Sequence, residues 1–318
     1  MRGVRAAFAT SALLLAMAAP ALAQSDASEP SARVCDDFRG QAERTLAAQP
    51  DSLQINNLLF EAARKGCARS LDKLTAAGAS RLARDRDGDT ALSLAARNGR
   101  LAFIDALIAG ASADERRQID APDAHGSTAL LLAAKAGRTD VAKRLIEAGA
   151  DIGAIDASGQ TALSAAVYAD NAEIAALLLS HGAKADSVDR SGRGVICYAA
   201  ARGSAEVVAK LIEAGVDVNA RYRADLTALM WAAGHADTTP AARAVETIKL
   251  LLARGAKLDL TDDRGRDALM IASSLNHVDA ARALREAGAN ADRLDKAGKS
   301  ALDLAPSEEM RTALKSPP

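Results

Sequence analysis

Apolar and polar positions along the chain follow a pattern that recurs about every 33 residues. The first apolar block of each period is clearest in DGDTALSLAARNG from Asp87, HGSTALLLAAKAG from His125, SGQTALSAAVYAD from Ser158 and ADLTALMWAAGHA from Ala224. Weaker copies begin at Ile55, Ser191, Arg264 and Ala297. The residues at the Thr position, which we call anchors, are Asn57, Thr90, Thr128, Thr161, Gly194, Thr227, Asp267 and Ser300, with spacings of 33, 38, 33, 33, 33, 40 and 33. A fixed period of this length predicts stacked repeats.

Each period predicts a hairpin followed by two helices. An Asp and a Gly stand five and two residues before the anchor, as in Asp156 and Gly159, and favour a tight turn. The anchor Thr then caps a short helix, and paired Ala residues allow neighbouring helices to pack closely. A Gly such as Gly137 ends that helix, and a longer apolar helix packs back. The sequence therefore predicts an all-α solenoid of about seven to eight helix-turn-helix units with hairpin-like loops and capped ends.

These two blocks in fixed register resemble the ankyrin repeat over about residues 52–314. The resemblance implies protein binding through the concave face of the array. The family's Pro after the anchor and its His two residues further on are absent, and the residues at the His position are Ser93, Leu131, Ser164, Cys197, Met230 and Met270. Two units are enlarged, at residues 111–118 and 236–244, and we expect exposed loops there.

The N-terminus has the features of a secretory signal peptide. Arg2 and Arg5 precede an apolar run of about 14 residues, which is short of the roughly 20 that span a bilayer. A small-residue site predicts cleavage after Ala23. We therefore expect a signal peptide at 1–23, a linker and helix at 24–51, a repeat domain at 52–318, and a periplasmic location in a bacterium. A eukaryotic secreted protein remains an alternative.

Export to an oxidising compartment makes one disulfide bond possible. Cys35 and Cys67 are the favoured pair, because a helix near residues 33–48 can fold back over the first repeat. Cys197 lies among apolar residues of a repeat helix, so we expect a buried core thiol.

Charge and motifs argue against several classes of function. Without residues 1–23 the chain carries 38 basic and 41 acidic side chains, which does not favour nucleic acid binding. The four His residues share no metal-ligand spacing, and Asp85–Asp89 is better explained as a hairpin than as a calcium loop. No phosphate-binding loop or nucleophile elbow is present. We expect no catalytic residue, cofactor or metal, no membrane insertion, and a monomer.

Partner contacts are expected from the hairpin tips and from the last turn of each first helix, as the resemblance implies. The tip candidates are Arg86, Asp87, His125, Arg190, Arg193, Arg223 and Arg264, and the helix-end candidates are Arg97, Lys135, Tyr168, Arg202 and His235. Arg and Tyr are frequent at interface hot spots, so we place the centre at Tyr168, Arg190, Arg193, Arg202 and Arg223. Tyr198 and Trp231 are assigned to the core. A basic cluster in the middle repeats favours an acidic partner surface.

The function predicted from the sequence is a periplasmic scaffold that binds a partner protein of unknown identity. An alternative is an immunity or inhibitor protein that neutralises a periplasmic toxin or enzyme. A second alternative is an enzyme or small-molecule binder with a pocket at the inserted loops, where Asp114 and Glu115 adjoin Arg116 and Arg117.

Overall fold

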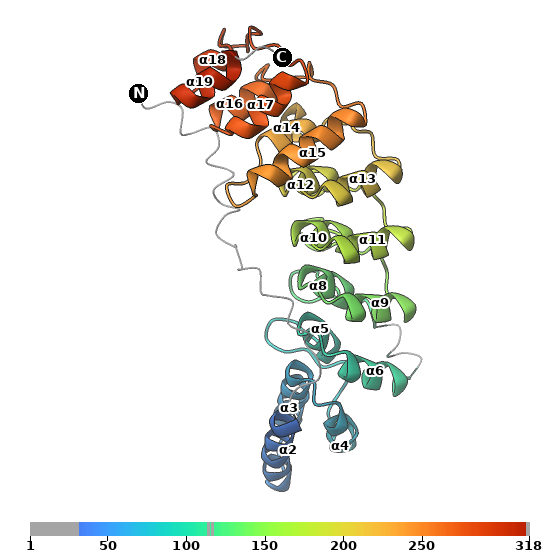
Figure 1. Ribbon diagram of the computed structural model, residues 1–318. Coiled ribbons are helices and arrows are strands. Elements are labelled where there is room, and N and C mark those ends of the chain that lie inside the picture. Colours follow the sequence, from blue (N-terminus) through green and yellow to red (C-terminus); the bar gives the residue numbers. More distant parts are fainter. Residues whose placement is uncertain (1–31, 113–114, 116–117, 316–318) are drawn as a thin grey trace.

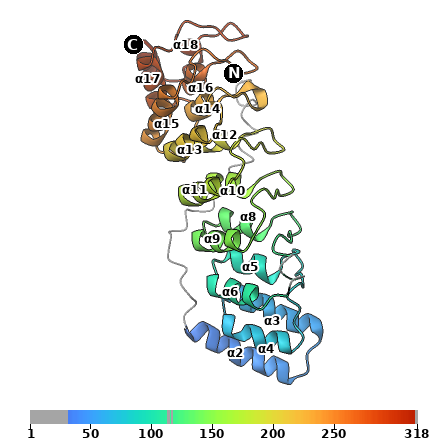
Figure 2. The ribbon, with the colours of Figure 1, turned by 90° about the vertical axis from the view of Figure 1, so that its right-hand side faces the viewer.

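The chain forms a single stack of helix pairs. The computed structural model describes residues 32–112, 115 and 118–315, so the predicted signal peptide lies outside the described residues. Figures 1 and 2 show two columns of helices, with loops projecting beside the first column. This part of the chain holds seventeen α-helices and no β-strand, only two isolated bridges. The all-α solenoid predicted from the sequence is confirmed.

Eight helix pairs follow the N-terminal helix α2 (Ala32–Ala47). They are α3 (Ser52–Lys65) with α4 (Leu71–Ala76), α5 (Ala91–Arg97) with α6 (Leu101–Ala109), α8 (Ala129–Lys135) with α9 (Thr139–Glu147), α10 (Ala162–Tyr168) with α11 (Ala172–Ser180), α12 (Val195–Ala201) with α13 (Ala205–Glu213), α14 (Ala228–Ala233) with α15 (Ala241–Ala253), α16 (Ala268–Ser274) with α17 (Val278–Glu286), and α18 (Ala301–Leu304) with α19 (Glu308–Lys315). The first helices of six pairs, α5, α8, α10, α12, α14 and α16, lie in one column of Figure 1. We call this column the inner column and these helices the inner helices.

The anchor residues begin the inner helices by capping them. The Thr90 hydroxyl accepts a hydrogen bond from the backbone N–H of Ser93, and the Ser93 side chain accepts one from the backbone N–H of Thr90. Thr161 and Ser164 form the same reciprocal box at α10. Ser at the usual His position therefore stabilises the start of the helix.

Hairpins before successive inner helices are joined by one backbone hydrogen bond per step. The amide of Ala157 donates to the carbonyl of His125 at 2.8 Å, and that of Arg190 to Ser158 at 3.0 Å. An amide-to-carbonyl bond joins every step from Asp87 to Lys296, with Gly192 as the acceptor at the step to Arg223. Seven hairpins are thereby linked into one continuous row, which we call the hairpin row.

The first unit departs from the pattern. Helix α3 begins at Ser52 with Asp51 as its cap, so Asn57 lies inside the helix. The prediction that Asn57 is an anchor equivalent to Thr90 was therefore wrong, and no hairpin precedes this unit. The long α3 instead supports α2, whose Phe38 is fully buried.

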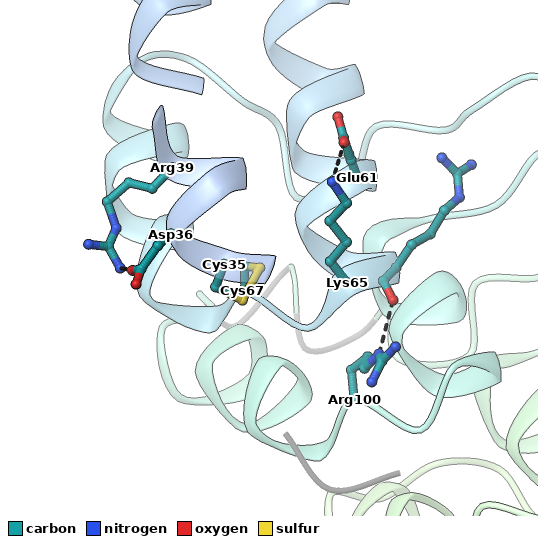
Figure 3. The surroundings of a disulfide bond; sticks show 8 residues. Cys35, Asp36, Arg39, Glu61, Lys65, Cys67 and Arg100 are labelled. Carbon is teal, nitrogen blue, oxygen red and sulfur yellow. Dashed lines mark hydrogen bonds and ion pairs between the residues drawn. A yellow bond between two sulfur atoms is a disulfide. The ribbon is translucent and has the colours of Figure 1, made fainter. Parts of the chain in front are cut away.

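A disulfide bond joins α2 to the end of the first unit (Figure 3). The sulfur atoms of Cys35 and Cys67 are 2.13 Å apart. Lys65 lies over the Phe38 ring, 5.5 Å from its centroid, and pairs with Glu61 at 2.7 Å. Helix α2 thus covers the N-terminal end of the stack, and we call α2 with Cys67 the N-terminal lid.

The enlarged unit after Thr227 differs from the expectation of an exposed loop. Residues 241–244 form the first turn of α15, which has 13 residues against nine in α9, α11 and α13. Ala244 is fully buried, and the buried Thr239 donates to the carbonyl of Ala201. The expected exposure of 236–244 was wrong at these positions, because the inserted residues pack against the preceding unit.

Candidate functional site

Aromatic rings and guanidinium groups gather on the inner helices of the middle units. The Tyr168 and Tyr198 rings meet edge to face, with centroids 5.8 Å apart. The Arg202 guanidinium lies 5.3 Å from the Tyr168 ring centroid, and its Nε donates to the Tyr168 carbonyl at 2.9 Å. The Arg193 guanidinium lies 5.9 Å from the ring centroid of Trp231. We call Tyr168, Arg193, Tyr198, Arg202 and Trp231 the aromatic–arginine cluster.

A carboxylate orients the centre of this cluster. The Tyr198 hydroxyl donates to Asp189, and burial together with this bond raises the pKa of Tyr198 to about 12. Burial would raise the pKa of Asp189, but hydrogen bonds from Ser191, Tyr198 and the hairpin backbone lower it overall. The Asp189 carboxylate therefore stays ionised at neutral pH and holds Tyr198 in place.

A polar network crosses the middle units beside the cluster. Asp170 adopts φ 58° at a turn where several other units have glycine, as at Gly137 with φ 68°. Its carboxylate accepts two hydrogen bonds from Arg243, at 2.8 and 2.9 Å, and a third from Ser204. Although burial would raise it, the pKa of Asp170 is lowered by these bonds. The network joins the Thr161 unit to the Thr227 unit across the unit between them.

The anchor Gly194 is explained by a neighbouring ring. A Cβ at this position would lie 2.1 Å from Cε1 of Tyr222. The Tyr222 ring therefore occupies the space that the Thr side chain uses in other units. Helix α12 consequently begins without a side-chain cap.

Most predicted partner residues on the hairpins are exposed. This holds for Arg86, Asp87, His125, Arg190, Arg223 and Arg264, and also for Lys135 at the end of α8. Tyr168, Arg193 and Arg202 are partly buried and come together in the cluster.

Two helix-end candidates have structural contacts instead. Arg97 pairs with the buried Asp89 at 3.0 Å and lies 3.6 Å from Asp123 of the next hairpin. His235 is only 8% exposed and stacks on His277, with ring centroids 3.9 Å apart. The expectation that His235 presents a surface side chain was wrong, because the His277 ring of the next unit covers it.

The sequence reasoning missed several surface residues. Trp231, assigned to the core, is partly exposed beneath Arg193. Ile155 and Val188 are 56% and 51% exposed on neighbouring hairpins, each one residue before the hairpin Asp. That shared register position was the signal that could have identified them.

Other groups offer little chemistry. Burial raises the pKa of the Cys197 thiol to about 12, and this side chain is 1% exposed. Among the described residues, no three His, Cys, Asp or Glu side chains are grouped so that they could hold a metal ion. None of the helices in that part of the chain has the length and apolar character needed to cross a membrane.

A hollow of about 350 Å³ lies beside the first enlarged link, between residues 81–84 and α6. Arg81 donates to the carbonyl of Leu107, and Arg84 to that of Gly88. Glu115 accepts the backbone N–H of Ser112. These polar groups are engaged within the fold, and Asp114, Arg116 and Arg117 lie outside the described residues.

Comparisons with known proteins agree with this architecture. A family model described as ankyrin repeats matches three times, over residues 59–156, 148–222 and 229–315. The crystal structure of the human ASB11 ankyrin repeat domain is similar, with 29% sequence identity and a TM-score of 0.63. The match covers 72% of this chain and 100% of that domain. The comparison with curated proteins gave no match. Arrays of this fold are typically non-enzymatic scaffolds for protein interactions.

Proposed function

Because the chain belongs to the ankyrin-repeat family, we propose that it is a scaffold that acts in the periplasm and binds one partner protein on its inner face. The binding centre is the aromatic–arginine cluster. The observation that carries this proposal is the direct contact of Tyr, Trp and Arg side chains across three successive units. These three residue types dominate interface hot spots.

The contacts within the cluster favour binding because they fix the side chains beforehand. Tyr198 is held by Asp189, and Arg202 by the carbonyl of Tyr168. Less conformational entropy is lost on association when rings and guanidinium groups are already ordered. The Asp170 and Arg243 pair adds stiffness to the same units.

The periplasmic location is supported by the sequence of residues 1–23 and agrees with the Cys35–Cys67 disulfide bond. Fractionation of the source cell, followed by mass determination of the mature chain, tests it. We expect the protein in the periplasmic fraction with Gln24 as its first residue. Recovery from the cytoplasm with residues 1–23 attached would contradict the proposed location.

Affinity capture from a periplasmic extract tests the binding function. We expect the native chain to retain one protein, and the Tyr168→Ala, Arg193→Ala variant to lose it. The control Lys143→Ala, Lys249→Ala changes exposed residues on the outer helices α9 and α15 and should retain it. Circular dichroism melting should show that all three chains are folded. Equal capture by the cluster variant, or no capture by the native chain, would refute the proposal.

A further inference from the structure

Charge changes sign along the hairpin row. The five residues before each anchor in the first three hairpins, 85–89, 123–127 and 156–160, contain five acidic side chains and one basic. The corresponding residues in the last four hairpins contain seven basic and five acidic side chains. The two ends of the inner face therefore present different electrostatic surfaces, although the whole chain is nearly neutral.

Several acidic groups in the last four hairpins are engaged by their own backbone. Oδ1 of Asp189 accepts the N–H groups of Ser191 and Arg193. Asp295 accepts those of Ala297 and Lys299 in the same way. The Asp at this position serves the turn in every hairpin of the row that has one, since Asp85, Asp123 and Asp156 accept the equivalent N–H groups in the first three. Asp262 does the same, and its second oxygen pairs with Arg266.

Arg266 pairs with Asp262, but the other basic groups of these hairpins form no ion pair with a carboxylate within the described residues. Arg190 donates to the carbonyl of Ala157, and Lys296 to that of Asp263, which are neutral acceptors. Arg223, Arg264 and Lys299 are exposed and have no side-chain hydrogen bond or ion pair within the described residues. A row of available cationic groups thus extends from the cluster towards the C-terminal end.

We propose that the segment of the partner that lies on this row is an extended, acidic stretch of polypeptide, whose carboxylates meet Arg190, Arg223, Arg264 and Lys299. The inference rests on the proposed function, since it names the chemistry of the protein bound on the same inner face. The backbone bonds between hairpins make the basic row continuous, so one segment can contact several units. Exposed Val188 and Leu294, each one residue before the Asp of one of the last four hairpins, fit apolar side chains of such a segment. These apolar groups, and the acidic first hairpins, favour a protein over a nucleic acid.

Fluorescence anisotropy with a short labelled peptide in which Glu alternates with Val and Ser tests the proposal. We expect it to bind the native chain, and a peptide with Gln in place of Glu to bind about tenfold more weakly or less. The Arg223→Glu, Arg264→Glu, Lys299→Glu variant should bind the Glu peptide at least about tenfold more weakly. The control Lys143→Glu, Lys184→Glu, Lys249→Glu makes the same charge change at exposed positions away from the row and should bind it like the native chain. The affinity of the native chain should fall as ionic strength rises.

Equal affinity of the two triple variants, or of the Glu and Gln peptides, would overturn the inference. It would also be overturned if single-stranded DNA or phosphatidylglycerol vesicles bound as tightly as the Glu peptide. Capture of the partner by the variants distinguishes failure of this inference from failure of the proposed function. If Arg223→Glu, Arg264→Glu, Lys299→Glu still captures the partner while Tyr168→Ala, Arg193→Ala does not, the acidic segment is refuted but the proposed scaffold function is supported. If the native chain captures nothing, the scaffold itself is refuted.

Discussion

Aromatic residues lie in two regions of the molecule, the N-terminal end and the middle units, and their burial differs between the two. Phe38, Phe60 and Phe103 lie in α2, α3 and α6 and are at most 2% exposed. All three Tyr residues and the Trp lie between residues 168 and 231, in the middle units. The first unit has no repeat on one side, so Phe38 and Phe60 fill the core between the N-terminal lid and α3, and Phe103 is buried in the next unit. The middle units are supported from both sides, so Tyr168, Tyr222 and Trp231 can be partly exposed while only Tyr198 of this group is buried.

Truncating one ring in each region gives the largest expected effect. Phe38→Ala should lower the free energy of unfolding by about 3–5 kcal/mol, because it leaves a cavity beneath the lid. Tyr168→Ala should lower it by only about 1–2 kcal/mol, since that ring is partly exposed. Urea unfolding measures both changes. Affinity for the captured partner should decrease for Tyr168→Ala and stay unchanged for Phe38→Ala. If Phe38→Ala had the larger effect on both stability and affinity, the proposed difference between the two regions would be refuted.

Removing the disulfide bond comes next in size. Cys35→Ser with Cys67→Ser should lower the free energy of unfolding by about 2–4 kcal/mol, because the unfolded chain is no longer cross-linked over 32 positions. Hydrogen exchange should show lost protection in α2 to α4 and unchanged protection in α8 to α13. Equal loss throughout the stack would contradict the view that the lid acts locally.

Restoring the usual anchor at Gly194 should destabilise the middle units by about 1–3 kcal/mol. Thr offers a helix cap, but its side chain would overlap the Tyr222 ring. Thermal melting of Gly194→Thr measures the loss. In a Tyr222→Ala background the same substitution should instead stabilise the protein, and a loss in both backgrounds would exclude the ring as the cause.

Acidification should have the smallest effect, and it should act in the Thr227 unit of the middle region. Burial and the adjacent His277 lower the pKa of His235 below its usual 6.5. The unfolded chain therefore binds this proton more readily, so stability is complete above about pH 6.5 and decreases as the pH falls towards the folded-state value. Unfolding measured between about pH 7 and 5.5 should show a smaller decrease for His235→Gln. In the control His125→Gln, which changes an exposed hairpin residue, the free energy of unfolding should depend on pH as it does in the native chain.

Features set by short repeated patterns could be predicted from the sequence. Thr128 with its hairpin, and Gly137 after its helix, recur in register and locate each element within a residue or two. The surroundings of His235 and Trp231 could not be predicted in this way, because they depend on contacts between units. The site was predicted in part, since Tyr168, Arg193 and Arg202 were identified but the contacts with Tyr198 and Trp231 were not.

The hydrogen bonds between Asp170 and Arg243 also bear on how the array responds to tension. Units that touch only their immediate neighbours peel away one at a time when the ends of a solenoid are pulled. A bond that spans 73 positions and passes over a whole unit ties three units into one mechanical element. Under force, the segment from α10 to α15 should therefore yield in a single step, so the surface proposed to hold the partner should resist longer than the ends of the molecule.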